Sequence, residues 1–100
     1  MHGPLLARSV RRYIQEKAQR WEAAARYREK VAELQSEGQT GAKSLVAAGI
    51  ILEDRLGRFH RAVQLYRKAI RMGLTDPVML LRILESLHAA GKQAEALIAV

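Results

Sequence analysis

The chain has 100 residues, of which 49% are hydrophobic and 27% are charged, and only two are prolines. This balance is typical of one small folded domain and excludes a disordered tail. Cysteine is absent, which excludes disulfides, thiolate chemistry and cysteine-ligated zinc. No apolar run approaches the ~18–20 residues of a membrane-spanning helix, and the apolar stretch at the N-terminus is too short for a signal peptide. We therefore expect a cytoplasmic protein that makes no contact with a membrane.

The formal net charge of +7 is large for this length and is typical of proteins that bind nucleic acid or acidic partners. Between Arg55 and Arg71 the chain carries six arginine or lysine side chains and no acidic ones. At helical spacing, four of them lie opposite the apolar residues and define a basic face: Arg61, Arg67, Lys68 and Arg71. A solvated helix surface is the simpler interpretation, and contact with phosphates or an acidic partner is the alternative.

The N-terminal segment, residues 5–36, contains no glycine or proline and consists mostly of good helix formers. Two arrangements fit it. The first is a degenerate pair of helices that bends near Gln19 and Arg20. The second is one unbroken helix of ~30 residues. We favour the bent pair, because an isolated long helix would leave Trp21 and Tyr27 with little to pack on.

A polar loop with two glycines, from Ser36 to Gly41, is the clearest break in the chain. Beyond it, apolar periodicity predicts helices over 42–56 and 58–72. Gly57 lies between them, at a point where the chain usually needs a positive φ that glycine adopts without strain.

The last part of the chain begins with a link in which Thr75 or Asp76 is a suitable N-cap and Pro77 takes the first helical position. We expect a helix over 77–90, a turn at Gly91 and a final helix from Lys92. The predicted fold is therefore all-α, with about six helices in a single domain over 1–100. Its parts are the N-terminal pair (5–36), a repeat (43–76) and a partial repeat (77–100).

The repeat is visible in positions thirty-four residues apart. Gly57 matches Gly91, and Ala62 matches Ala96. A period of about 34 residues is the length of a helix-turn-helix unit that stacks into a solenoid. Gly57 followed by Ala62, Val63, Tyr66, Ala69 and Ile70 resembles the tetratricopeptide repeat, whose second helix carries small residues and an aromatic at these spacings.

The resemblance implies a short right-handed solenoid of antiparallel helix pairs. Two departures stand out. Where the family prefers a small residue in the first helix, this chain has Ile50 and Leu84, with Gly49 one residue earlier. The closing proline of the family is absent, although Pro77 follows a few residues later. The second copy repeats Gly91 and Ala96 but stops in mid-helix at Val100.

In tetratricopeptide proteins the first helices of successive pairs line a concave groove, so the resemblance also implies where a partner would bind. The matching positions are Ala47, Ile51, Asp54, Arg55, Val78, Leu81, Glu85 and His88. Much of this surface is apolar or small, which suits an extended peptide or an amphipathic helix of another protein. We therefore expect a non-catalytic interaction module of the adaptor or chaperone type. The competing interpretation is that Ile51 and Leu81 are core residues of a slightly shifted register.

Catalysis finds little support in the sequence, and we expect neither an enzyme nor a cofactor. His2, His60 and His88 lie far apart without the spacing of a metal site. The aromatic residues take core-like positions, so binding of nucleic acid would be electrostatic and would use the basic face. That binding is the alternative function.

The chain ends in the apolar run from Ala96 to Val100. A solenoid usually finishes with a polar capping helix, because an uncapped repeat exposes apolar surface. We expect this end to continue into further chain or to be covered by a second copy or by another protein.

Overall fold

The computed structural model describes residues 3–35 and 38–99, with side chains for 7–35 and 38–92. These residues form four helices and no strand, so the all-α prediction is confirmed and the expected number of about six helices is wrong. The helices are α1 (Gly3–Leu34), α2 (Gln39–Asp54), α3 (Phe59–Arg71) and α4 (Pro77–Ala99). The molecule is flat, with principal extents of 57 × 42 × 18 Å.

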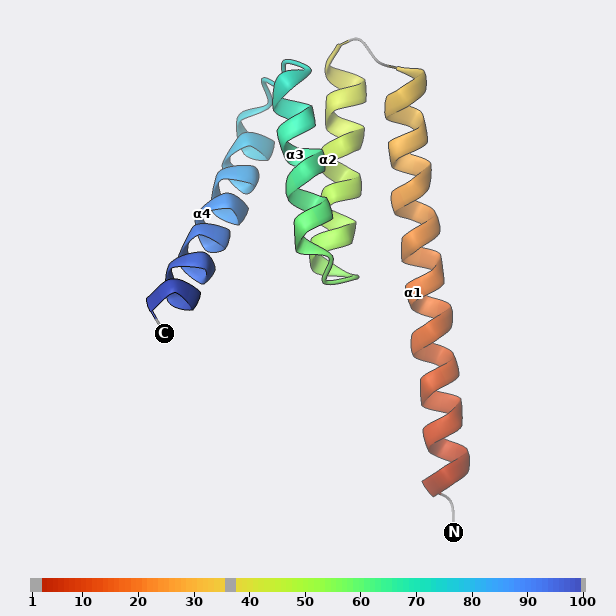
Figure 1. Cartoon of the computed structure of the whole chain (residues 1–100). Coiled ribbons are helices and arrows are strands. Elements are labelled where there is room, and N and C mark those ends of the chain that lie inside the picture. The colour runs from red at the N-terminus through yellow and green to blue at the C-terminus, as the bar shows by residue number, and fades with distance from the viewer. Residues whose placement is uncertain (1–2, 36–37, 100) are drawn as a thin grey trace.

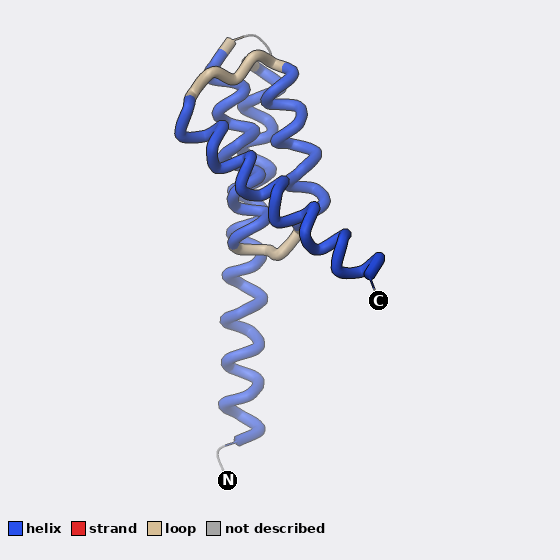
Figure 2. Tube along the Cα trace, turned by 90° about the vertical axis from the view of Figure 1, so that its left-hand side faces the viewer, coloured by secondary structure: helices blue, strands red, loops and turns tan. Residues whose placement is uncertain are grey.

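The N-terminal segment is one helix of 32 residues, so the expected bend near Gln19 and Arg20 is wrong. Nothing in the segment interrupts the helical hydrogen bonds, and its C-terminal half packs along the other helices. Trp21 is half-buried there, with the Arg55 guanidinium 4.7 Å from its ring centroid. Tyr27, in contrast, stays 66% exposed. The N-terminal half of α1 extends beyond the α2–α3 turn (Figures 1 and 2).

The centre of the molecule is the antiparallel pair of α2 and α3. Gly57 makes the turn between them with φ +64°, as the sequence predicts. α2 begins at Gln39, three residues before the predicted start, so Thr40 and Gly41 belong to the helix and not to the preceding loop. In Figure 1, α1 and α4 lie on opposite sides of this pair.

α4 runs without a break through Gly91, where the sequence predicts a turn. An added Cβ at Gly91 would meet nothing within 4 Å, and its φ is not positive, so no turn geometry requires a glycine there. The described residues therefore hold one helix pair, and no second repeat or solenoid follows it. The start of α4 is confirmed, because Asp76 Oδ1 accepts hydrogen bonds from the backbone N–H of Val78 (3.0 Å) and Met79 (3.1 Å).

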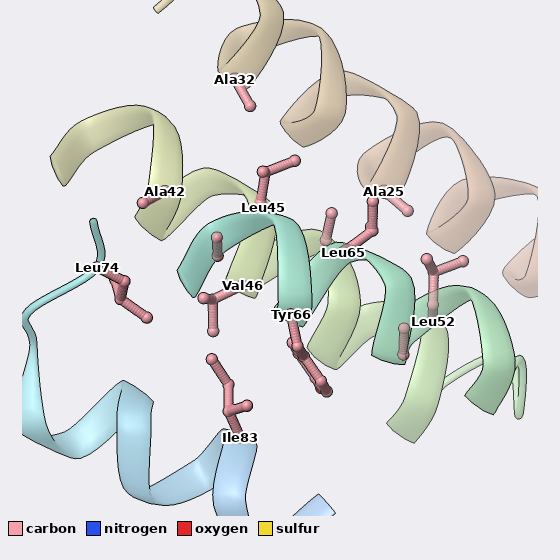
Figure 3. Close-up of a cluster of buried hydrophobic side chains, with 13 residues drawn as sticks. Ala25, Ala32, Ala42, Leu45, Val46, Leu52, Leu65, Tyr66, Leu74 and Ile83 are labelled. Atoms are coloured by element: carbon pink, nitrogen blue, oxygen red, sulfur yellow. The ribbon is translucent and has the colours of Figure 1, made fainter. Parts of the chain in front are cut away.

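The core lies on both sides of the α2–α3 pair (Figure 3). Leu45 and Leu65 point toward α1, while Val46 and Tyr66 lie on the side of Ile83 from α4. All of these side chains are at most 3% exposed. The single pair thus provides the packing surface for the helices before and after it.

Gly49 and Tyr66 make the closest packing contact between α2 and α3. A Cβ on Gly49 would lie 2.4 Å from Cε1 of the Tyr66 ring. The small residue that allows this close approach is therefore Gly49, one position before Ile50. This register turns Ile50 away from α3 and leaves it only partly buried.

Gly49→Ala should destabilise the fold. Helix propensity favours alanine by about 1 kcal/mol, but the buried Tyr66 ring cannot move away, so we expect a net loss of about 1–3 kcal/mol in the free energy of unfolding. The matched control is Gly91→Ala, which meets no atom and should stabilise α4 by up to about 1 kcal/mol. Urea unfolding followed by circular dichroism measures both changes, and equal effects of the two variants would contradict the contact.

Candidate partner-binding groove

α2 has an outer face, opposite to the face that packs on α3. This outer face and the Trp21 side chain of α1 line an open hollow of about 440 Å³. The lining residues are Trp21, Ile50, Ile51, Asp54 and Arg55. We call this hollow the α2 groove.

The α2 groove has an apolar floor and a charged rim. Trp21, Ile50 and Ile51 are partly buried, so each presents part of its apolar side chain to solvent. Asp54 and Arg55 are exposed, and the Arg55 guanidinium lies over the Trp21 ring, a cation–π arrangement that holds the indole in place. Such a surface can hold an apolar side chain of a partner and pair with a charge beside it.

The structure brings together only some of the predicted groove residues. Ile51, Asp54 and Arg55 line the α2 groove, and Ala47 is partly buried on the same helix without lining it. The four predicted residues of α4 do not line it, although all are exposed: Val78, Leu81, Glu85 and His88. Ile51 packs partly against the core, so its interpretation as a core residue holds in part. Leu81 is 57% exposed, so the same interpretation is wrong for Leu81.

Trp21 and Ile50 line the groove although the sequence pattern did not predict them there. Trp21 lies far from α2 in the sequence, and only the packing of α1 against α2 brings it to the groove. For Ile50 the sequence held one indication, because a large residue stands where the tetratricopeptide pattern prefers a small one. If Gly49 is taken as that small residue, Ile50 is expected at the surface.

A polar junction fixes α4 to α2 at the other edge of the groove. Arg82 Nη2 lies 2.8 Å from Glu53 Oε2 and 2.7 Å from Asp54 Oδ1. The Ser86 hydroxyl donates a hydrogen bond to Glu53 Oε2 at 3.0 Å. Because Asp54 also lines the groove, the position of this carboxylate depends on α4.

Tyr66 lies behind this junction. Burial of the phenol, and then the nearby charge of Glu53, raise the pKa of Tyr66 to about 12. The Tyr66 hydroxyl and Glu53 Oε1 are buried without a hydrogen-bond partner among the described residues. A phenol with this pKa stays neutral near pH 7 and is poorly suited to accept or release a proton in catalysis.

The predicted basic face is only partly free. Arg61 turns toward α1, where its Nη2 lies 2.5 Å from Glu29 Oε1, and Arg58 pairs with Glu22 in the same way. Arg67, Lys68 and Arg71 are exposed and make no ion pair within the part of the chain that the structure describes. The basic face is therefore divided into an arginine that stabilises the α1–α3 contact and three cations that face solvent.

Within residues 3–35 and 38–99, no group of three or more His, Asp or Glu side chains lies close enough to hold a metal ion. No helix of the described chain is both long and apolar enough to cross a membrane. The predicted apolar C-terminal surface from Ala96 to Val100 lies outside the described side chains.

Comparison with known proteins gives no relative: no family model matches the sequence, and neither a curated protein nor a solved structure matches it. The resemblance to tetratricopeptide repeats therefore remains a prediction that rests on residues of α2 and α3.

Ionisation of Tyr66 should make the fold less stable at high pH. The tyrosine of the unfolded chain loses its proton near pH 10, and Tyr66 in the folded chain loses it near pH 12. The stabilisation is therefore fully present below pH 10 and is lost as the pH rises through 12, by up to about 3 kcal/mol.

Urea unfolding of Tyr66→Phe and of the unsubstituted chain, at several pH values between 9 and 12, tests this. The substitution should remove the corresponding part of the pH dependence. Tyr27→Phe, which removes the same hydroxyl from an exposed ring, is the matched control and should behave as the unsubstituted chain. An unchanged pH profile of Tyr66→Phe would contradict the expectation.

Proposed function

We propose that this chain is a non-catalytic protein-interaction module that holds an apolar segment of another protein, as an extended peptide or an amphipathic helix, in the α2 groove. The observation that carries the proposal is the grouping of Trp21, Ile50 and Ile51 at the solvent surface, beside Asp54 and Arg55. Tryptophan and arginine are the residues most often found at the energetic centre of protein interfaces.

The neighbouring face of α4 supports the same proposal. Val78 is 76% exposed and Leu81 is 57% exposed, so large apolar side chains continue across the helix that borders α2. Exposed apolar surface of this kind is typical of partner-binding sites. A partner seated in the α2 groove could extend over α4, with Glu85 and His88 as polar contacts.

The α2–α3 pair also supports a finer proposal on the fold. A small residue against a buried aromatic, with glycine in the turn, is what a tetratricopeptide-like pair needs. We propose that α1, the α2–α3 pair and α4 form a short array of this kind, in which α4 takes the place of the next first helix.

The alternative function is binding of nucleic acid or of an acidic partner through Arg67, Lys68 and Arg71. The exposure of these three cations favours this alternative function. The pairing of Arg61 with Glu29 counts against it, because it leaves fewer cations of the basic face free to bind a phosphate or a carboxylate. Salt distinguishes the two functions, because binding to phosphates weakens steeply as salt rises.

Ile51→Glu should abolish partner binding, because a carboxylate would enter the apolar floor of the groove. The test uses immobilised purified chain, a lysate of the source organism and a wash at about 0.5 M salt, followed by quantitative mass spectrometry. Proteins retained by the unsubstituted chain should be lost with Ile51→Glu. Leu81→Glu, at an exposed position that cannot unfold the core, should weaken the same interactions.

The matched control is Ile70→Glu, which makes the same change at a partly exposed position of α3. It should retain the same proteins, and circular dichroism should show equal helicity for all variants. Equal retention by Ile51→Glu and the unsubstituted chain would contradict the groove. Loss of all bound material in the salt wash, or with Arg67→Glu and Arg71→Glu together, would favour the basic face instead.

A further inference from the structure

The N-terminal half of α1 projects from the bundle and carries a surface of its own. We call residues 7–20 the α1 extension; every side chain in it is exposed except Ala18, which is partly buried. Its apolar residues include Val10, which is 52% exposed, and Ile14, which is 59% exposed. Figures 1 and 2 both show this part of α1 beyond the other helices.

The apolar side chains of the extension continue the face that α1 already uses inside the bundle. There, Ala25 is buried against the α2–α3 pair, and Trp21 is partly buried beside α2. Ile14 lies about three helical turns before Ala25, and Val10 about three turns before Trp21, so each is on the same side as its counterpart. The extension therefore presents a helix-packing face whose partner is not among the described residues.

The charge beside this face reverses along α1. Inside the bundle, Glu22 and Glu29 form the flank, and they pair with Arg58, just before α3, and with Arg61 of α3. About three turns before Glu22, the same flank carries Arg11. The extension has five basic residues, Arg8, Arg11, Arg12, Lys17 and Arg20, and only one acidic residue, Glu16.

We propose that the α1 extension is a second docking surface, separate from the α2 groove, which binds an acidic amphipathic helix of another protein. Apolar side chains of that helix would pack on Val10 and Ile14, and its carboxylates would face Arg8 and Arg11. This packing repeats the contact of α1 with the α2–α3 pair. In the bundle α1 supplies the acidic side chains, whereas in the proposed contact α1 supplies the basic ones. A chain with both surfaces can bridge two partners.

A second copy of this chain fits the surface poorly. In the bundle, the flank of α1 meets Arg58, just before α3, and Arg61 of α3, so a copy placed in the same way would set arginine against Arg8 and Arg11. A bilayer also fits poorly, because membrane-surface helices gather large apolar residues on one face and cations on the other. Here, Lys17 is exposed about two turns after Val10 on the same side of the helix, and the packing face contains alanines.

The test uses the full chain and a synthetic acidic amphipathic helix of about 18 residues, with leucine at helical spacing and glutamate on both flanks. A peptide of the same composition in scrambled order is the control. Fluorescence anisotropy at about 0.15 M salt measures binding of the labelled peptides. The ordered peptide should bind at least about tenfold more tightly than the scrambled one, because only the ordered peptide presents an apolar face.

Two double variants of the extension test its two components. V10Q/I14Q removes the apolar contact and R8E/R11E reverses the flank, and each should weaken binding at least about tenfold. The matched control R12E/R20E makes the same change in net charge away from the packing face and should stay within about threefold of the unsubstituted chain. Ile51→Glu should bind the peptide normally, because the α2 groove is a different surface.

Several results would overturn the proposal. Equal loss of binding in R12E/R20E and R8E/R11E, or equal binding of the scrambled peptide, would mean that net charge alone attracts the peptide. Loss of binding in Ile51→Glu would place the peptide in the α2 groove. A helical protein partner would be excluded if the peptide failed to bind. It would also be excluded if duplex DNA or phosphatidylserine vesicles bound more tightly than the peptide and R8E/R11E abolished that binding.

Discussion

The contact between Gly49 and the Tyr66 ring determines the rest of this structure. It lets α2 and α3 approach closely, and it sets the rotation of α2 about its axis. With Gly49 turned inward, Ile50, Ile51 and Asp54 must face away from α3. The same ring packs on the side of Ile83 from α4, so one buried aromatic links three helices (Figure 3). The α2 groove is therefore a consequence of core packing.

The outer helices are attached to this centre by mixed contacts. Small buried residues of α1, such as Ala25 and Ala32, allow it to lie close to the pair, and acidic side chains on its flank meet arginines of α3. α4 is held by Ile83 and by the ion pairs of Arg82. Partly exposed ion pairs contribute about 1 kcal/mol or less each, so their main effect here is to select the orientation of the helices.

Features that depend on neighbouring residues were predictable from the sequence. The turn at Gly57, the cap at Asp76 and the close pairing of α2 with α3 all follow from local turn chemistry and from the spacing of Ala62, Tyr66 and Ala69. The prediction at Gly91 was wrong because a glycine inside a helix costs only about 1 kcal/mol, and Ala89, Ala90 and Lys92 around it favour helix. Similarity to Gly57 across one period could not reveal this.

The candidate site was predictable only along α2. Ile51, Asp54 and Arg55 share a helix, and their common side follows from helical geometry. Trp21 could not be placed, because its position depends on how a distant helix packs. The prediction of a bend in α1 was wrong for the same reason, because it also depended on how a distant helix packs. α2 supplies the packing surface that Trp21 appeared to lack. The exposed α4 residues were assigned to the same groove by analogy with a second helix pair, which the described residues do not contain.

Amide hydrogen exchange of the free chain, followed residue by residue by NMR, tests most directly whether the α2–α3 pair is the centre of the fold. Amides of α2 and α3 around Val46 and Tyr66 should exchange most slowly, because they open only with the whole domain. The second half of α1 and the part of α4 around Ile83 should follow, and residues 7–17 of α1 should exchange fastest. Equal protection along the whole of α1, or faster exchange around Tyr66 than in α4, would contradict this account.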